Sequence, residues 1–233
     1  MKDQLELLIE FTKDEDARSR ATAIAGLAKL ADPRGFAPVL VALFDPVDEV
    51  RVTAATALGV YKDDRALEPL VSCLSDPCEQ VAVNCVWALG QLQSPKAASC
   101  LVDVIADATV SNAVRTAAVT AAGENASSQQ SPLLADEQLC ERARTSLLEL
   151  VRCEDDELRA TSIWTLGHLP SNSQAVDAFI DALQDNYEWV VRYAIEALAN
   201  AHDQRAAGPL QALLDDEREP VRDLAAKAIE QLQ

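Results

Sequence analysis

The stretch DPVDEVRVTAATALGVYKDDRALEPLVSCL, residues 45–74, contains two helical patterns and no recognisable catalytic group. In its first half, apolar residues recur at spacings of three and four, as they do on one face of a helix: Val50, Ala54, Ala57 and Leu58. In its second half, the same spacings join Leu67, Leu70, Val71 and Leu74. The stretch therefore predicts a pair of helices, each with one apolar face.

This pair recurs along the chain with a period of about 31 residues. Positions one period apart match in residue type: Arg20 and Arg51; Leu27, Leu58 and Leu89; Pro38 and Pro69; Asp45, Asp76 and Asp107; Asp185 and Asp216. One helix pair cannot bury its apolar face alone, whereas a stack of pairs can. We therefore predict an all-α fold, a right-handed α-solenoid of about seven helix-pair repeats.

The register of the repeats sets the expected helices and domain. First helices are expected near residues 14–29, 46–60, 77–92, 109–122, 155–168, 187–200 and 217–232. Second helices are expected near residues 34–44, 65–75, 95–106, 138–152, 172–184 and 205–215. We predict a single repeat domain over residues 1–233, with half-repeats at residues 2–12 and 217–232. Residues 124–137, ENASSQQSPLLADE, break the register, and their polar composition predicts an exposed loop.

Two kinds of helix-boundary residue recur within the repeats. In Asp45-Pro46 and Asp76-Pro77, the aspartate is expected to cap a first helix, because proline is favoured at the first helical position. Glycine follows the core leucine at Gly59, Gly90 and Gly167. A helix end or a close backbone contact suits glycine at these positions.

The charge of the chain excludes one class of partner and suggests another. Asp and Glu number 38 against 20 Lys and Arg, a net charge of −18, which disfavours binding to nucleic acid because phosphates must be neutralised by bases. The surplus serves solubility or attracts a basic partner. Neither a membrane span nor a signal peptide is recognisable, so we expect a cytoplasmic protein with its six cysteines as free thiols. Their spacing fits no zinc motif, and we expect no metal.

A family resemblance follows from these residues. The phrase D-P-x-x-x-V-R-x-x-A-x-x-A-L-G, followed by D-x-R-A-x-x-P-L-x-x-x-L, is similar to the HEAT-like repeat of the phycobilisome lyase type. The resemblance covers nearly the whole chain and implies a helical repeat fold. Such repeats occur in bilin lyases, phycobilisome degradation factors, Fe–S assembly helpers, immunity proteins and scaffolds, so the resemblance implies no single function.

A row of bases is the first candidate site. Arg34, Arg65 and Lys96 lie 31 residues apart at the starts of second helices, and Arg205 occupies the same position later in the chain. Aspartate precedes each of the three arginines by two residues, so the row can consist of Asp-x-Arg turns. Alternatively, it binds carboxylates of a partner or the propionates of a tetrapyrrole.

Aromatic and histidine residues give the remaining candidates. Trp87 and Trp164 each stand two residues before a core leucine, where they serve either packing between repeats or contact with a partner. They resemble the A-W-x-L-G helices of bilin lyase subunits. His168 and His202 each follow a first helix. We retain His168, with Arg205, as a ligand-binding candidate and predict no catalytic residue.

Three functions remain open. The leading hypothesis is a non-catalytic scaffold whose partner protein binds the concave ridge of second helices, at Arg34, Arg65 and Lys96, with Trp87 and Trp164 in support. The second is a phycobilin lyase subunit, chaperone or phycobilisome degradation factor, which would handle a phycocyanobilin-type bilin. The third is an acidic immunity or inhibitor protein. We expect no enzymatic activity, no cofactor, no nucleic acid and no membrane contact; any activity would be of the bilin lyase or isomerase type.

Overall fold

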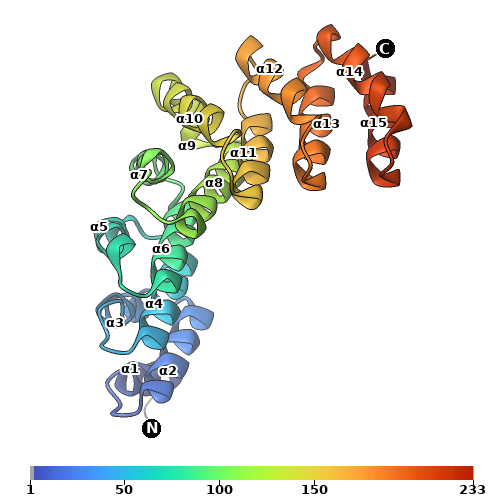
Figure 1. Ribbon diagram of the computed structural model, residues 1–233. Coiled ribbons are helices and arrows are strands. Elements are labelled where there is room, and N and C mark those ends of the chain that lie inside the picture. The colour runs from blue at the N-terminus through green and yellow to red at the C-terminus, as the bar shows by residue number, and fades with distance from the viewer. Residues whose placement is uncertain (1–2, 233) are drawn as a thin grey trace. The chain divides into compact units, whose positions relative to one another are not determined.

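The computed structural model describes residues 3–232, and every regular element within them is a helix (Figure 1). The protein is an all-α repeat solenoid, as the sequence predicted. Its contacts cluster into two compact units, unit 1 at residues 1–101 and unit 2 at residues 102–233. The single domain over residues 1–233 stays a prediction.

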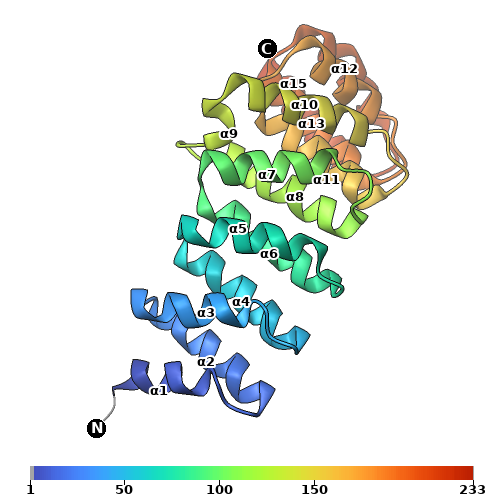
Figure 2. The same cartoon turned by 90° about the vertical axis from the view of Figure 1, so that its left-hand side faces the viewer.

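Unit 1 stacks its helix pairs in two layers. Its first helices are α2 (Ala17–Leu30), α4 (Asp48–Tyr61) and α6 (Glu79–Leu92), which pack side by side. Its second helices are α1 (Gln4–Phe11), α3 (Phe36–Ala42), α5 (Leu67–Ser72) and the start of α7 (Pro95–Ala106), and they form the other layer (Figure 2). Short 3₁₀ turns flank them: η1 (Pro33–Gly35), η2 (Asp64–Ala66) and η3 (Cys73–Ser75).

Unit 2 follows the same plan. Its first helices are α8 (Asn112–Ala126), α11 (Asp156–His168), α13 (Glu188–Ala201) and α15 (Glu219–Leu232), packed in that order. Its second helices are α10 (Glu137–Leu150), α12 (Ser173–Ala182) and α14 (Ala207–Ala212), with the 3₁₀ turns η4 (Gln204–Ala206) and η5 (Leu213–Asp215). A short extra helix, α9 (Pro132–Ala135), contacts α8 and α10.

The repeating leucines of the first helices form the core. Leu27, Leu58 and Leu89 are fully buried in unit 1, and Leu166 and Leu198 are buried in the same way in unit 2. Burying a leucine side chain stabilises a fold by about 2 kcal/mol relative to its exposure. The helical spacing that predicted the pairs therefore also predicted the core.

Four first helices end in the same backbone turn. Ala31, Lys62, Gln93 and His202 cap α2, α4, α6 and α13 in the left-handed region, with φ of 50–51°. Glycine usually occupies such caps because its φ is unrestricted. None of the four is a glycine, so the connection between the helices imposes this turn on residues that disfavour it.

The expected capping by Asp45 and Asp76 is wrong. The helices begin later, at Asp48 and Glu79, after an extended Val47 and Cys78. The Asp45 carboxylate instead accepts a hydrogen bond from the amide of Val47, at 2.9 Å, and Asp76 does the same with Cys78, at 2.8 Å. Both carboxylates stay outside the helices because arginines of the preceding repeats bind them.

The predicted loop at residues 124–137 is also wrong for most of its length. Helix α8 continues to Ala126, and α9 and α10 occupy most of the second half, which leaves only residues 127–131 and Asp136 outside helices. Pro132 and Leu133 are buried and anchor α9, although the surrounding residues are polar. The inserted residues therefore add a helical turn to the repeat.

None of the helices within residues 3–232 combines the length and the apolar character that a membrane-spanning helix needs.

Candidate partner-binding site

The candidate bases lie at the starts of second helices, as predicted. Arg34, Arg65 and Arg205 belong to the turns η1, η2 and η4, and Lys96 lies in the first turn of α7. Each arginine folds back onto the aspartate two residues before it: Nη2 donates to Asp32 at 3.0 Å, to Asp63 at 2.6 Å and to Asp203 at 2.8 Å. These bonds lower the pKa of all three carboxyl groups. The Asp-x-Arg turn is therefore present in all three places.

The same arginines also reach toward the preceding second helix. Arg34 lies 3.9 Å from the carboxylate of Asp3, and Arg205 donates to Asp177 at 2.6 Å. The Arg65 guanidinium stacks over the ring of Phe36, 4.4 Å from its centroid. The arginines thus connect successive second helices within their units.

Lys96 differs from these arginines. It is exposed, and within residues 3–232 it forms no ion pair. A role of this row of bases in binding a partner stays a prediction. Unlike the three arginines, Lys96 would offer that partner a charge that no described carboxylate pairs with.

The two tryptophans lie in the layer of first helices, away from the starts of the second helices. Trp87 on α6 rests on Gly59 of α4, and Trp164 on α11 rests on Gly123 of α8. A Cβ at Gly59 would lie 3.0 Å from Trp87 Cε3, and one at Gly123 would lie 2.9 Å from Trp164 Cε3, both below van der Waals contact. These contacts support the packing interpretation. Trp87 still keeps 37% of its surface exposed.

His168 lies against Trp164, one helical turn away on α11. Their ring centroids are 4.6 Å apart, and the Nδ1–H of His168 donates to the carbonyl of Trp164 at 2.8 Å. The imidazole is exposed at the end of the helix. Arg205, the other ligand-binding candidate, lies in η4 with its carboxylate partners, and His202 is the cap of α13.

A ladder of arginine–aspartate pairs joins successive repeats, and sequence analysis missed it. Arg51 donates to both oxygens of Asp76, at 2.8 and 2.9 Å, and to the carbonyl of Asp45 at 2.9 Å. The same two-bond pair joins Arg20 to Asp45 and Arg159 to Asp185. The signal in the sequence is an arginine followed by an aspartate 25 or 26 positions later. From the sequence alone, these residues set the register, and Asp45 and Asp76 were expected to be helix caps rather than ion-pair partners.

Two exposed apolar residues on α3 and its end were also missed. Val41 is 75% exposed and Phe44 is 61% exposed, the highest values for large apolar side chains in the described part of the chain. One period later, the same positions hold Ser72 and Ser75. A comparison with that repeat would have identified Val41 and Phe44 as apolar residues at polar positions.

Within residues 3–232, the cysteines and the other metal-binding residue types are not gathered into a metal site. Among residues 3–232 no cysteine forms a disulfide bond, and burial raises the pKa of the Cys73 and Cys85 thiols, which keeps them protonated. Among the described residues, no three His, Cys, Asp or Glu side chains are grouped to hold a metal ion.

Comparison with known proteins agrees with this repeat architecture. The sequence profile of HEAT repeats matches residues 5–82, 67–137 and 144–230. No curated protein matches the chain. An archaeal HEAT-like repeats protein from Thermococcus onnurineus NA1 superimposes with a TM-score of 0.64 at 19% identity, covering 100% of this chain and 98% of the other.

Two further structures are similar and were solved with a partner. A designed armadillo repeat protein in complex with the peptide (KR)4 has a TM-score of 0.60 at 21% identity, covering 99% of this chain and all of the other. The complex of CpcE and CpcF of phycocyanin lyase from Nostoc sp. PCC7120 has a TM-score of 0.55 at 18% identity, covering 100% of this chain and 96% of the other. At these identities the likeness shows the fold alone. The HEAT profile, however, matches most of the sequence, and the chain therefore belongs to the HEAT-repeat family.

Proposed function

We propose that this protein is a non-catalytic scaffold that binds a partner protein along the ridge of its second helices. Membership of the HEAT-repeat family supports the class, because stacked repeats present an extended surface for binding. Two proteins of similar fold were solved with a peptide or with a second protein chain. An immunity protein would be the special case in which the partner is a basic toxin.

One observation carries the proposal: Val41 and Phe44 are the most exposed large apolar side chains among residues 3–232. Both lie at the end of a second helix, where packing between repeats does not use them. Exposed apolar side chains set among polar ones mark binding surfaces. Arg34 lies in η1, directly before α3, so a base and two exposed apolar side chains stand at the two ends of one second helix.

Site-specific crosslinking tests this proposal. A photoreactive p-benzoylphenylalanine is placed at Phe44, and in a matched variant at Val60, which is 46% exposed on the first helix α4. We expect a crosslinked protein partner from position 44 and a much weaker adduct from position 60. Adding Val41→Ser should reduce the adduct at position 44. Equal adducts from both positions would contradict binding at the second helices.

Bilin handling is the second candidate, and the observation that favours it is the contact between the rings of Trp164 and His168, which are tilted by 56° to each other. An aromatic ring beside an exposed imidazole offers stacking and a hydrogen bond to a tetrapyrrole. Mixing the protein with phycocyanobilin and recording absorption and fluorescence separates the two functions. A scaffold leaves the bilin spectrum unchanged, whereas a shifted fluorescent band that Trp164→Ala removes would establish bilin binding.

A further inference from the structure

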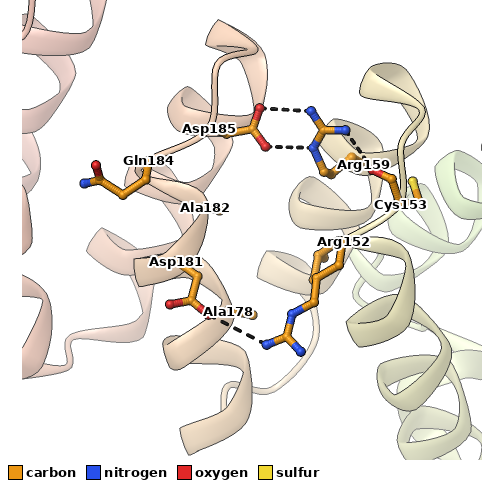
Figure 3. A pocket seen from close by; sticks show the side chains of 9 residues that line it. Arg152, Cys153, Arg159, Ala178, Asp181, Ala182, Gln184 and Asp185 are labelled. Carbon is orange, nitrogen blue, oxygen red and sulfur yellow. Dashed lines mark hydrogen bonds and ion pairs between the residues drawn. The ribbon is translucent and has the colours of Figure 1, made fainter.

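Unit 2 contains a polar pocket of about 360 Å³ between the end of α10, the start of α11 and the second half of α12 (Figure 3). Two ion pairs line it, one deep and one at the surface: Arg159 with Asp185, and Arg152 with Asp181. The two pairs differ in how firmly they are held.

In the deep pair, Arg159 has no N–H donor left for a ligand, because its remaining donor points to the carbonyl of Glu154. Arg159 donates to both oxygens of Asp185, at 2.7 and 3.0 Å, and also to the carbonyl of Cys153 and the carboxylate of Asp156. Asp185 further accepts from the amide of Tyr187. Both side chains of the pair are at most 16% exposed. This pair belongs to the ladder between repeats and is a structural part of the pocket.

The surface pair is loose by comparison. Arg152 and Asp181 approach to 3.7 Å, beyond hydrogen-bond distance, and their side chains are 76% and 72% exposed. Exposed pairs of this kind are weak. Within residues 3–232, the carboxylate of Asp181 accepts no hydrogen bond, whereas the nearby Asp177 holds Arg205 at 2.6 Å. Asp181 is therefore the carboxylate of this helix that another cation can take over most easily.

The charge of unit 2 indicates which ligand would compete with Arg152. Residues 102–233 contain 23 Asp and Glu against 10 Lys and Arg, so they carry −13 of the net charge of −18. A field of this sign attracts cationic segments and repels anionic ones. A basic side chain on a partner chain matches both the field and the exposed carboxylate.

We infer that Asp181 is a binding subsite for a lysine or arginine side chain of the partner, and that Arg152 occupies this subsite in the free protein. The inference rests on the proposed scaffold function and adds the chemistry of the partner. Arg152 acts as an internal competitor: its guanidinium swings away when a basic side chain enters, and the pocket beside Asp181 receives the aliphatic part of that side chain.

The test uses a fluorescein-labelled octapeptide of alternating lysine and arginine, with binding measured by fluorescence anisotropy in low-salt buffer. The variants are Arg152→Gln, Asp181→Asn and the double variant. Lys227→Gln and Asp223→Asn serve as controls, because each makes the same charge change at an exposed position on α15. Thermal melting followed by circular dichroism shows that all variants fold.

Relative to its control, Arg152→Gln should tighten binding by about 3-fold, and Asp181→Asn should weaken it by about 5-fold, effects of the size expected for one exposed charge pair. In the double variant, the benefit of Arg152→Gln should disappear. If Asp181→Asn and Asp223→Asn weaken binding equally, the peptide senses only net charge and the subsite is refuted. If the peptide does not bind at all, the basic partner is refuted, while crosslinking from position 44 still tests the scaffold independently.

Discussion

The contact between Gly59 and Trp87 can be tested by a pair of substitutions. Gly59→Ala should destabilise the wild-type protein but stabilise a variant in which Trp87 is replaced by alanine. In the wild-type background, Gly59→Ala places a Cβ 3.0 Å from Trp87 Cε3, closer still to Cζ3, and 3.1 Å from the Cα of Ala88. Overpacking of this kind costs about 1–3 kcal/mol. Alanine inside a helix gains about 1 kcal/mol over glycine. We expect a net loss of about 1 kcal/mol in the free energy of unfolding.

In a Trp87→Ala background, the indole ring is absent and only the contact with Ala88 remains. The helix propensity of alanine should then dominate, so Gly59→Ala should raise the free energy of unfolding by about 0.5 kcal/mol. Gly208→Ala is the control, because a Cβ there meets nothing within 4 Å. The matching position in α3 already holds an alanine before a proline, Ala37.

Urea unfolding followed by circular dichroism measures all four variants of the cycle and the control, with the slope of each transition checked for constancy. Fluorescence does not serve, since Trp87 is the tryptophan of unit 1 and is itself removed. If Gly59→Ala has the same sign and size in both backgrounds, Trp87 does not rest on Gly59, and the packing role assigned to the tryptophan is wrong.

Three further outcomes are expected. Asp76→Asn should lower the free energy of unfolding by about 2–3 kcal/mol at neutral pH, because the 13%-exposed Arg51 loses its counter-charge. The bonds from Arg51 lower the pKa of Asp76, so this contribution is present above about pH 4 and is lost as the pH falls through the lowered pKa; urea unfolding of wild type and variant should converge in acid. Reversing both Arg65 and Lys96 to Glu should weaken binding of the crosslinked partner in a pull-down with only a small drop in the melting temperature, because the exposed pair of Arg65 with Asp63 contributes little stability; a sharp drop in that temperature would make the row structural. Limited proteolysis should cut first at residues 128–130, and a first cut within α4 or α5 would contradict the assigned repeats.

The sequence predicted the helix pairs and the core because both depend on local spacing and on a repeat of fixed length. The prediction that Asp45 caps a helix was wrong, because an aspartate before a proline satisfies local capping rules wherever it occurs. Only the packed structure shows that Arg20, 25 residues earlier, binds that carboxylate. The prediction of an exposed loop at residues 124–137 was wrong for a related reason: their average composition is polar, yet Pro132 and Leu133 are buried.

The candidate site was predictable in part. The aspartates before Arg34 and Arg65 indicated the turns that the structure contains. The exposure of Val41 and Phe44 was not predictable from helical spacing alone, because it depends on which edge of α3 faces away from its neighbours. The loose pairing of Arg152 with Asp181 likewise depends on the distance between two helices, which no local pattern encodes.

The ladder of arginine–aspartate pairs also makes unit 1 extendable by whole repeats. If residues 45–75 were duplicated in tandem, Arg51 of the first copy would meet Asp45 of the second copy at the separation that now joins it to Asp76. The new joint would thus carry its own ion pair without further design. Two mismatches would arise. Gly59 of the first copy would face Thr56 where Trp87 now lies, and Tyr61 of the second copy would face Ala66, whose Cβ would overlap the hydroxyl that Gly35 now accommodates. Growth of such a protein by gene duplication therefore requires a cut at a repeat boundary, the refilling of one cavity and the relief of one overlap.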